Sequence, residues 1–193
     1  MSKRQLVKKR MNNPLYYCYG RITSSSLYTL TKLFSSTESS LDTARKLRSE
    51  ELAENVGYYE ERYLEHYDQY DIQYKDPSKE EREENYNITP DDFLLIKDEL
   101  SYLLNSPVCR MRYATMEPNK HLEYHIDQPG KDRFIMVLEG EHVFYIKNKE
   151  REFSQIMKPG ELWYVNTNWE HKVENISNQQ RLALLGCFEY NNI

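Results

Sequence analysis

Two histidines and one aspartate form the pattern in this sequence that chemistry explains best. His125 and Asp127 are separated by one residue, and His171 follows 46 residues after His125. Two imidazoles and a carboxylate can occupy adjacent coordination positions of a ferrous ion and leave the others open for further ligands. The simpler explanation is polar residues at strand ends, but the second histidine favours a metal site.

Arg181 lies ten residues after His171 and adds a site for an anion. A dicarboxylic 2-oxo acid such as 2-oxoglutarate can chelate iron through its keto acid end, and its far carboxylate then needs a fixed positive charge. A guanidinium is permanently charged and can bind a carboxylate through two parallel hydrogen bonds. The alternative is an arginine that emerges into solvent where an apolar strand begins. We favour the anion site, because a short hairpin would bring this arginine close to His171.

The elements that must position these residues are β-strands, predicted from residue 108 onward. Short alternating segments are separated by turn-forming residues such as Glu139-Gly140-Glu141 and Lys158-Pro159-Gly160. Because side chains alternate along a strand, His125 and Asp127 would face one cavity. The pattern predicts a two-sheet jelly roll, a double-stranded β-helix of the cupin kind. The predicted strands are 109–116, 121–125, 133–138, 142–147, 152–157, 161–165, 171–175 and 181–190.

Helical periodicity precedes this region. Tyrosines at intervals of three or four along 52–74 predict a helix with a buried aromatic face, and a shorter helix is predicted at 40–47. A further helix is predicted from Pro90 to Leu103, with Thr89 as its N-cap. The first 38 residues have no readable pattern. We therefore predict an α+β fold, mainly β in its catalytic core, in which residues 1–106 form an N-terminal helical part packed on one sheet of the core at 107–193.

Composition excludes several kinds of partner. The formal net charge is -5, and no basic stripe is available for a nucleic acid, although basic residues are frequent in the first ten positions. No segment approaches the roughly 20 apolar residues of a membrane helix, and no secretory signal is recognisable. Cys18, Cys109 and Cys187 form no metal-binding pair and are expected to be reduced thiols. We expect a cytoplasmic protein without membrane association.

The C-terminal half resembles the aspartyl/asparaginyl β-hydroxylase family, which includes free-proline hydroxylases. This resemblance spans about residues 108–189, and its matching segments are 118–125, Asp127, Arg133, 159–161 and 171–175 through Arg181. It implies a jelly-roll oxygenase that uses Fe(II) and 2-oxoglutarate. His125 and His171 would be iron ligands, Arg181 would bind the far carboxylate, and Arg133 would help to hold the co-substrate near the metal.

Two positions distinguish this chain within the family. Some members lack the carboxylate ligand, which Asp127 supplies here, and halogenating relatives replace it by a small residue to make room for chloride. Asp127 therefore favours hydroxylation. Free amino acid hydroxylases also carry a serine that helps to bind 2-oxoglutarate, where this chain has Ala114. Thr115 and Tyr113 beside it are the candidate replacements for that serine.

Other polar residues are expected to have lesser roles. His121 shares a strand face with His125 but lies about 13 Å from it, so we do not expect it to bind the metal. His66 and His142 are expected at the surface. Arg110 or Arg112 is a candidate partner for a carboxylate of the substrate.

The sequence thus predicts an Fe(II)/2-oxoglutarate-dependent dioxygenase that hydroxylates an unactivated C–H bond of an amino acid or an amino acid side chain. It would consume O2 and form succinate and CO2, with a small molecule or a peptide as substrate. Metal binding requires neutral imidazoles and is expected to weaken below about pH 6.5. Two alternatives stay open: a cupin-like metalloenzyme that does not use 2-oxoglutarate, and a non-catalytic jelly-roll binding module. Arg181 favours the first prediction.

Overall fold

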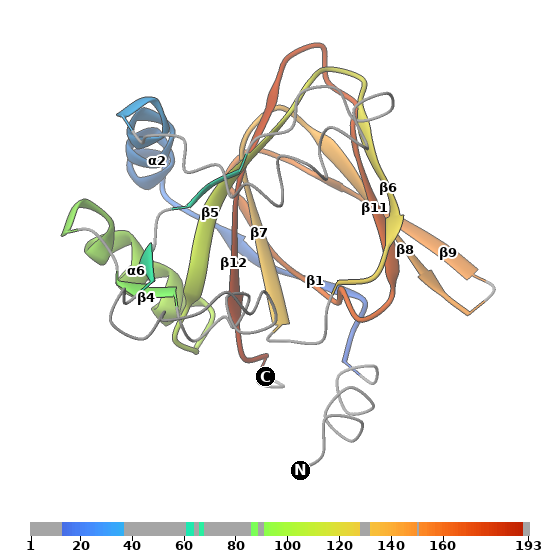
Figure 1. Cartoon of the computed structure of the whole chain (residues 1–193), viewed down its shortest axis with the longest axis horizontal. Helices are drawn as coiled ribbons and strands as arrows, with labels where there is room; N and C mark the ends of the chain where they lie inside the picture. Colours follow the sequence, from blue (N-terminus) through green and yellow to red (C-terminus); the bar gives the residue numbers. More distant parts are fainter. Residues whose placement is uncertain are drawn as a thin grey trace.

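Two antiparallel sheets face each other in the computed structural model, which describes residues 13–36, 61–63, 66–67, 86–88, 91–127, 132–149 and 151–190 (Figure 1). The large sheet consists, in spatial order, of β1 (Tyr16–Arg21), β10 (Glu161–Val165), β7 (Asp132–Glu139), β12 (Arg181–Phe188), β5 (Cys109–Met116) and β2 (Glu61–Tyr63). The small sheet consists of β6 (His121–His125), β11 (Glu170–Asn175), β8 (His142–Asn148) and β9 (Arg151–Met157). A separate pair joins β3 (His66–Tyr67) to β4 (Tyr86–Ile88).

The chain passes back and forth between the two sheets from β5 to β12. β5, β7, β10 and β12 lie in the large sheet, and β6, β8, β9 and β11 lie in the small one. This order is that of a cupin-like jelly roll, and the predicted fold is confirmed. All eight predicted strands of this region are present, most with bounds within one residue of those expected.

Two helices cover the outer face of the large sheet. Helix α2 (Ser24–Ser36) begins after Thr23, whose hydroxyl accepts a hydrogen bond from the backbone N–H of Ser26 at 3.1 Å. Helix α6 (Asp91–Leu103) matches the helix predicted at 90–103. Their apolar faces pack with the outer side of the sheet around Leu30, Phe93, Ile96, Leu100, Met111, Tyr113, Phe134 and Leu184. Within the described ranges, no helix has the length and apolarity that crossing a membrane would require.

A second apolar core fills the space between the sheets. It contains residues from both layers, among them Met116, Ile135, Val137, Phe144, Ile146, Trp163, Val173 and Ala183. The large sheet is therefore buried on both faces, and the seven residues from Asp132 to Leu138 in β7 are all buried. The helices cover the outer face of the sheet, so a metal or ligand site between the sheets must be formed by side chains on the inner faces.

The description of residues 1–106 as helical is corrected by the two outer strands of the large sheet. β1 pairs with β10, and β2 pairs with β5, with Glu61 opposite Ala114 and Tyr63 opposite Arg112. The predicted tyrosine helix is therefore wrong at 61–63, and also at 66–67 in β3. Strand pairing satisfies backbone groups along β5 that would otherwise form an open sheet edge, which outweighs helical periodicity. The rest of that helix, the helix at 40–47, Thr89 and Pro90 lie outside the described residues.

Candidate metal centre

His125, Asp127 and His171 come together at one end of the small sheet. One ligand atom of each lies within 4.8 Å of the others. β6 and β11 pair so that His125 is directly opposite His171, with ring centroids 4.3 Å apart. Asp127 follows two residues after β6, where its backbone N–H donates to the carbonyl of Thr167 at 3.2 Å. The three residues thus share the end of one strand pair and the loop beside it.

Backbone carbonyls fix the orientation of both imidazoles. His125 Nδ1 lies 2.7 Å from the carbonyl oxygen of Glu123, and His171 Nδ1 lies 2.9 Å from that of Trp169. A carbonyl can only accept, so each Nδ1 carries the proton and each Nε2 presents a lone pair. Histidines that bind a metal through Nε2 usually donate the other ring N–H to a carbonyl or carboxylate in this way.

Arg133 on β7 holds the carboxylate of Asp127. Its Nε donates to Asp127 Oδ2 at 3.2 Å, and another of its nitrogens contacts the sulfur of Cys187. Burial alone would raise the pKa of Asp127, but Arg133 and, to a lesser degree, the two histidines and Arg112 lower it to about 2. Asp127 Oδ1, which faces His125 Nε2 at 3.8 Å, is therefore part of an ionised carboxylate at neutral pH.

His171 is the most buried member of the cluster, at 4% exposure. Its ring stacks on Phe144 with a centroid distance of 5.4 Å. Burial lowers the pKa of His171 to about 4 and outweighs the opposing effect of Asp127, while His125 and Arg133 act in the same direction as burial. The imidazole is neutral over the physiological range, as metal binding requires.

Arg181 begins β12 and points into the interior between the sheets, where it is 2% exposed. Its Nε donates to Nδ1 of His142 on β8 at 3.1 Å, so this hydrogen bond joins the large sheet to the small one. The expectation that His142 is a surface residue is wrong, because the side chain is fully buried. Burial, and then the charge of Arg181, lower the pKa of His142 well below its usual range.

The turn before Arg181 is held by Asn175, which is fully buried. Its side-chain Nδ2 donates to the carbonyls of Met116, Glu117 and Gln179, and its Oδ1 accepts from the backbone N–H of Ser177. The β7–β8 turn approaches from the other side. A Cβ added to Gly140 would lie 3.2 Å from the Cα of Arg181. The start of β12 is therefore fixed by both neighbouring turns.

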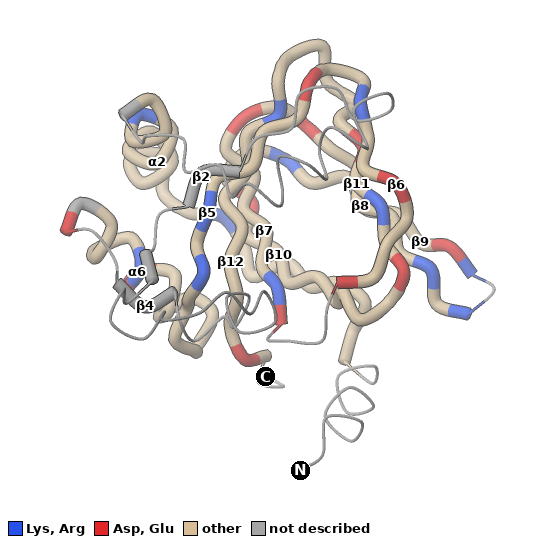
Figure 2. Tube along the Cα trace, in the orientation of Figure 1, with Lys and Arg blue, Asp and Glu red and all other residues tan. Residues whose placement is uncertain are grey.

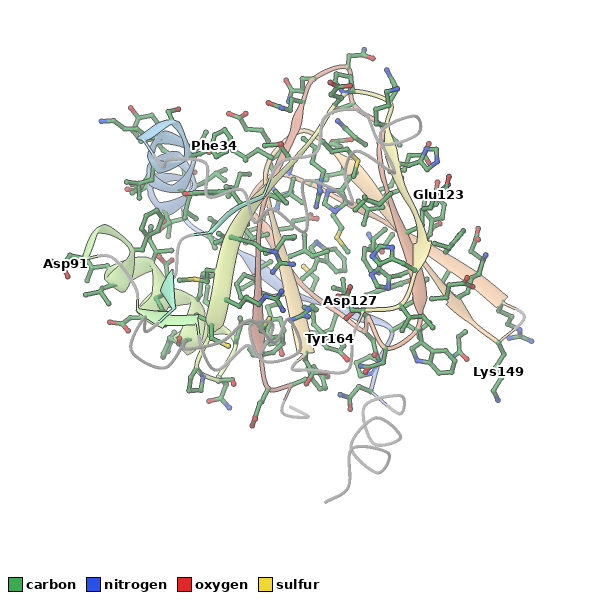
Figure 3. The ribbon with its side chains drawn as sticks, viewed as in Figure 1. Phe34, Asp91, Glu123, Asp127, Lys149 and Tyr164 are labelled. Atoms are coloured by element: carbon green, nitrogen blue, oxygen red, sulfur yellow. The ribbon has the colours of Figure 1, made fainter. Side chains whose placement is uncertain are left out.

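The inner face of β8 shows how far the His125–Asp127–His171 cluster lies from the partner of Arg181 along the strands. Ile146 pairs with His171, and Asn175, four residues further along β11, pairs with His142. At about 3.3 Å per residue, these two levels are about 13 Å apart along the strand. Phe144 lies between them. The cluster and the buried guanidinium thus occupy different levels of one interior, and Figure 3 shows Asp127 between the two sheets.

Two of the predicted co-substrate residues lie on the wrong face of β5. The hydroxyl of Tyr113 donates to the carbonyl of Leu30 in helix α2 at 2.7 Å, in the outer core. Thr115 pairs with Leu182, which packs in the same outer core, so alternation directs Thr115 to the helices as well. The expectation that either binds 2-oxoglutarate between the sheets is corrected. Ala114 faces the interior, but it has no polar group.

Two buried arginines lie on β5, and one of them acts on the cluster. Figure 2 marks basic residues within this strand, and Arg110 and Arg112 are only 4% and 8% exposed. Arg112 contributes to the lowered pKa of Asp127. The described contacts of Arg133 run to Asp127 and Cys187, which makes it a residue that positions a metal-facing carboxylate. Sequence reasoning missed His142, Asn175 and this contact of Arg133.

The donor set fits a divalent transition metal. Two neutral imidazole nitrogens and one ionised carboxylate oxygen face one another, and this combination suits ferrous iron with positions left open. Asp127 supplies the negative charge, and the hydrogen bonds at Nδ1 and Oδ2 fix all three side chains. Such a set can bind a metal without a large rearrangement of the protein.

The match to a protein family agrees with the fold. Residues 112–186 match the cupin domain family, and no curated protein matches the sequence. Oxalate oxidase in complex with glycolate is 20% identical with a TM-score of 0.37, over 44% of this chain and 43% of that chain. Oxalate decarboxylase of Bacillus subtilis is 18% identical with a TM-score of 0.38, over 45% of this chain and 22% of that one. This chain covers less than two thirds of the length of either structure.

Proposed function

We propose that this protein is an Fe(II)- and 2-oxoglutarate-dependent oxygenase that hydroxylates an unactivated C–H bond of an amino acid or of an amino acid side chain in a peptide. The observation that carries the proposal is the combination of the His125–Asp127–His171 cluster with a buried arginine in the same interior. A metal site alone would not require a cation there. Arg181 supplies the charge that the far carboxylate of a chelated keto acid would need.

Each residue has a distinct role in this proposal. His125 and His171 would bind iron through Nε2 and Asp127 through Oδ1, while Arg133 holds the carboxylate in place. Iron bound there would supply the oxygen chemistry that converts 2-oxoglutarate to succinate and CO2 and oxidises the substrate. The protein orients the two reactants and excludes water from the space between the sheets.

The reaction type follows from Asp127. A retained carboxylate ligand leaves no vacant position for a halide, so hydroxylation is favoured over halogenation. The resemblance to aspartyl/asparaginyl β-hydroxylases supports an amino acid or a peptide as the substrate. Arg112, which is buried and contributes to the lowered pKa of Asp127, is suited to a substrate that carries a carboxylate.

The direct test is formation of succinate. Protein loaded with Fe(II) without oxygen is then given oxygen and 2-oxoglutarate, with free amino acids and short peptides as substrates. We expect 2-oxoglutarate-dependent succinate in the wild type, and a loss of at least about 100-fold in His125→Ala or His171→Ala. His121→Ala is the matched control, because His121 lies on the same strand and its side chain contacts Glu123. A wild type that binds no 2-oxoglutarate in the presence of metal would exclude this function.

A cupin-type metalloenzyme that does not use a keto acid is the second candidate. It is favoured by one observation, which is that Arg181 already has a hydrogen-bond partner in His142 and could serve to join the sheets. In that case Arg181→Ala would leave the metal-dependent activity intact. Under the 2-oxoglutarate proposal, the same variant loses co-substrate binding while its metal affinity is retained.

A further inference from the structure

His142 is a buried polar residue that the proposed chemistry does not yet use. It begins β8, its side chain is fully buried, and it lies on the same strand face as Phe144 and Ile146, which belong to the core between the sheets. β8 thus presents Ile146 at the level of His171, then Phe144, then His142. The imidazole stands at the end of the interior where Arg181 enters.

The direction of the Arg181–His142 hydrogen bond fixes the tautomer of the imidazole. Arginine has donors only, so Nδ1 of His142 is the acceptor in the 3.1 Å contact with Arg181 Nε. The proton of the neutral ring is therefore on Nε2. This assignment is the reverse of that in His125 and His171, where Nδ1 carries the proton.

Packing alone does not account for a histidine here. His142 Nε2 is buried and has no hydrogen-bond partner among the described residues. A buried donor without a partner costs free energy, which an apolar side chain of similar size would avoid. The hydrogen bond that Nδ1 accepts from Arg181 offsets this cost. A function of His142 must therefore act through Arg181.

A neutral acceptor suits an arginine that has to bind an anion. A carboxylate partner on Nε would bring a negative charge to the guanidinium, whereas a neutral imidazole orients it without adding one. The Nε–H is taken by His142, so the terminal nitrogens keep a fixed direction. Gly140 and the Asn175 turn fix the backbone of Arg181, and His142 fixes its side chain.

We propose that His142 is a positioning residue that holds Arg181 for the far carboxylate of the co-substrate, and so makes the site selective for dicarboxylic 2-oxo acids over monocarboxylic ones. This inference rests on the proposed function. It assigns selectivity to a residue that touches neither the metal nor the substrate.

The test measures binding rather than turnover. Protein is loaded with Mn(II), and the dissociation constants of 2-oxoglutarate and 2-oxopentanoate are measured by calorimetry. These two keto acids have the same chain length, but only the first has a far carboxylate. We expect wild type to prefer 2-oxoglutarate strongly. His142→Phe and His142→Leu should lower this preference at least about tenfold, because each variant removes one hydrogen bond to a charged group. His142→Gln, which keeps an acceptor, should retain most of the preference.

A double-mutant cycle separates positioning from a general effect on the fold. If His142 acts through Arg181, adding His142→Phe to Arg181→Ala should lower the preference no further. The Mn(II) affinity should be unchanged in every variant, because the metal-facing residues are untouched. Additive losses, or equal losses for both keto acids, would show that His142 has only a structural role.

Wild-type protein gives an independent readout if the apolar variants do not fold. Nitrogen NMR should find His142 protonated at Nε2 alone, and His125 and His171 of the metal-free protein protonated at Nδ1. A proton on Nδ1 of His142 would overturn the inference. Wild type that binds 2-oxoglutarate while His142→Phe keeps the full preference overturns this inference alone. Wild type that binds no 2-oxoglutarate overturns the proposed function as well.

Discussion

Asp127 illustrates how the residues of the candidate metal centre depend on one another. Its Oδ2 accepts from Arg133 while its Oδ1 faces His125, so one carboxylate serves two partners. The buried guanidinium of Arg133 requires the negative charge whether or not a metal is bound, because an unpaired buried charge is costly.

Replacing Asp127 by asparagine should therefore destabilise the metal-free protein. The lowered pKa of Asp127 means that its ionised form contributes to the free energy of unfolding at neutral pH, and we expect a loss of about 1–2 kcal/mol after allowance for its partial exposure. Urea denaturation with a chelator present measures this. Glu123→Gln, on the exposed face of β6, is the control and should change stability by less than about 0.5 kcal/mol. A stabilised Asp127→Asn would contradict the ion pair.

Metal-free stability should also fall as the pH is lowered from about 6.5 toward 4. His171 has a pKa of about 4 in the folded chain, so between these values the unfolded state binds more protons and is favoured by acid. We expect a loss of about 2 kcal/mol from His171 between pH 7 and pH 5. His142 acts in the same direction. Urea unfolding at the two pH values checks this, and equal stability would mean that these imidazoles are not buried in neutral form.

At the scale of elements, the turn between β11 and β12 determines where Arg181 enters the interior. Asn175 Nδ2 reaches three backbone carbonyls, which ties this turn to the end of β5. No other described side chain in the turn makes as many backbone contacts. β11 and β12 lie in different sheets and do not pair, so the short hairpin expected between His171 and Arg181 is wrong, and Asn175 holds a turn that leads from the small sheet to the large one.

Asn175→Ala should both destabilise the fold and weaken the anion site. Three backbone carbonyls, of which that of Met116 is buried, lose their side-chain donor, and we expect a loss of about 1–2 kcal/mol in the free energy of unfolding. The affinity for 2-oxoglutarate should fall while the affinity for Mn(II) stays unchanged. Thermal unfolding and calorimetry measure the two effects. Asn178→Ala, in the exposed part of the same turn, is the matched control. A loss of Mn(II) affinity in Asn175→Ala would contradict the prediction that the metal cluster and the anion site at Arg181 are held independently.

The strands of the jelly roll could be predicted because alternation is a local property. The bounds of β5, β6 and β10 agree with the sequence pattern. The faces of β5 could not be assigned in the same way. Tyr113 and Arg112 are both buried, and only the helices that cover one side of the sheet decide which of them faces the interior. This is the physical reason why Tyr113 and Thr115 were wrongly expected at the co-substrate.

His142 was misplaced for a related reason. At the start of a strand after a turn, a histidine is usually exposed, and its burial here depends on an arginine from the opposite sheet 39 residues later. The tyrosine periodicity at 52–74 failed at 61–63 because β2 completes the edge of β5. In both cases a contact distant in the sequence outweighed the local pattern.

At the scale of the whole molecule, the site is divided between the two layers. The His125–Asp127–His171 cluster belongs to the small sheet and its adjoining loop, and Arg181 belongs to the large sheet. Metal should therefore stabilise the protein by itself, and 2-oxoglutarate should add to this only when metal is present.

Thermal unfolding with Mn(II) and 2-oxoglutarate tests this division. At ligand concentrations about 100 times each dissociation constant, each ligand should add about 2.7 kcal/mol. Arg181→Ala should keep the increment from Mn(II) and lose the one from 2-oxoglutarate. If 2-oxoglutarate stabilised the metal-free protein to the same extent, the prediction that its binding at Arg181 depends on the metal would be contradicted.

The hydrogen bond from Arg181 to His142 spans the two layers before any ligand arrives. Its consequence is kinetic. The guanidinium already has its orientation when the keto acid enters, so no slow side-chain rearrangement is needed. The slow step of assembly is therefore expected to be the binding of the metal. In an order-of-addition experiment, protein first incubated with metal should bind 2-oxoglutarate rapidly. Protein first incubated with 2-oxoglutarate should form the complex with metal no faster than protein given both at once.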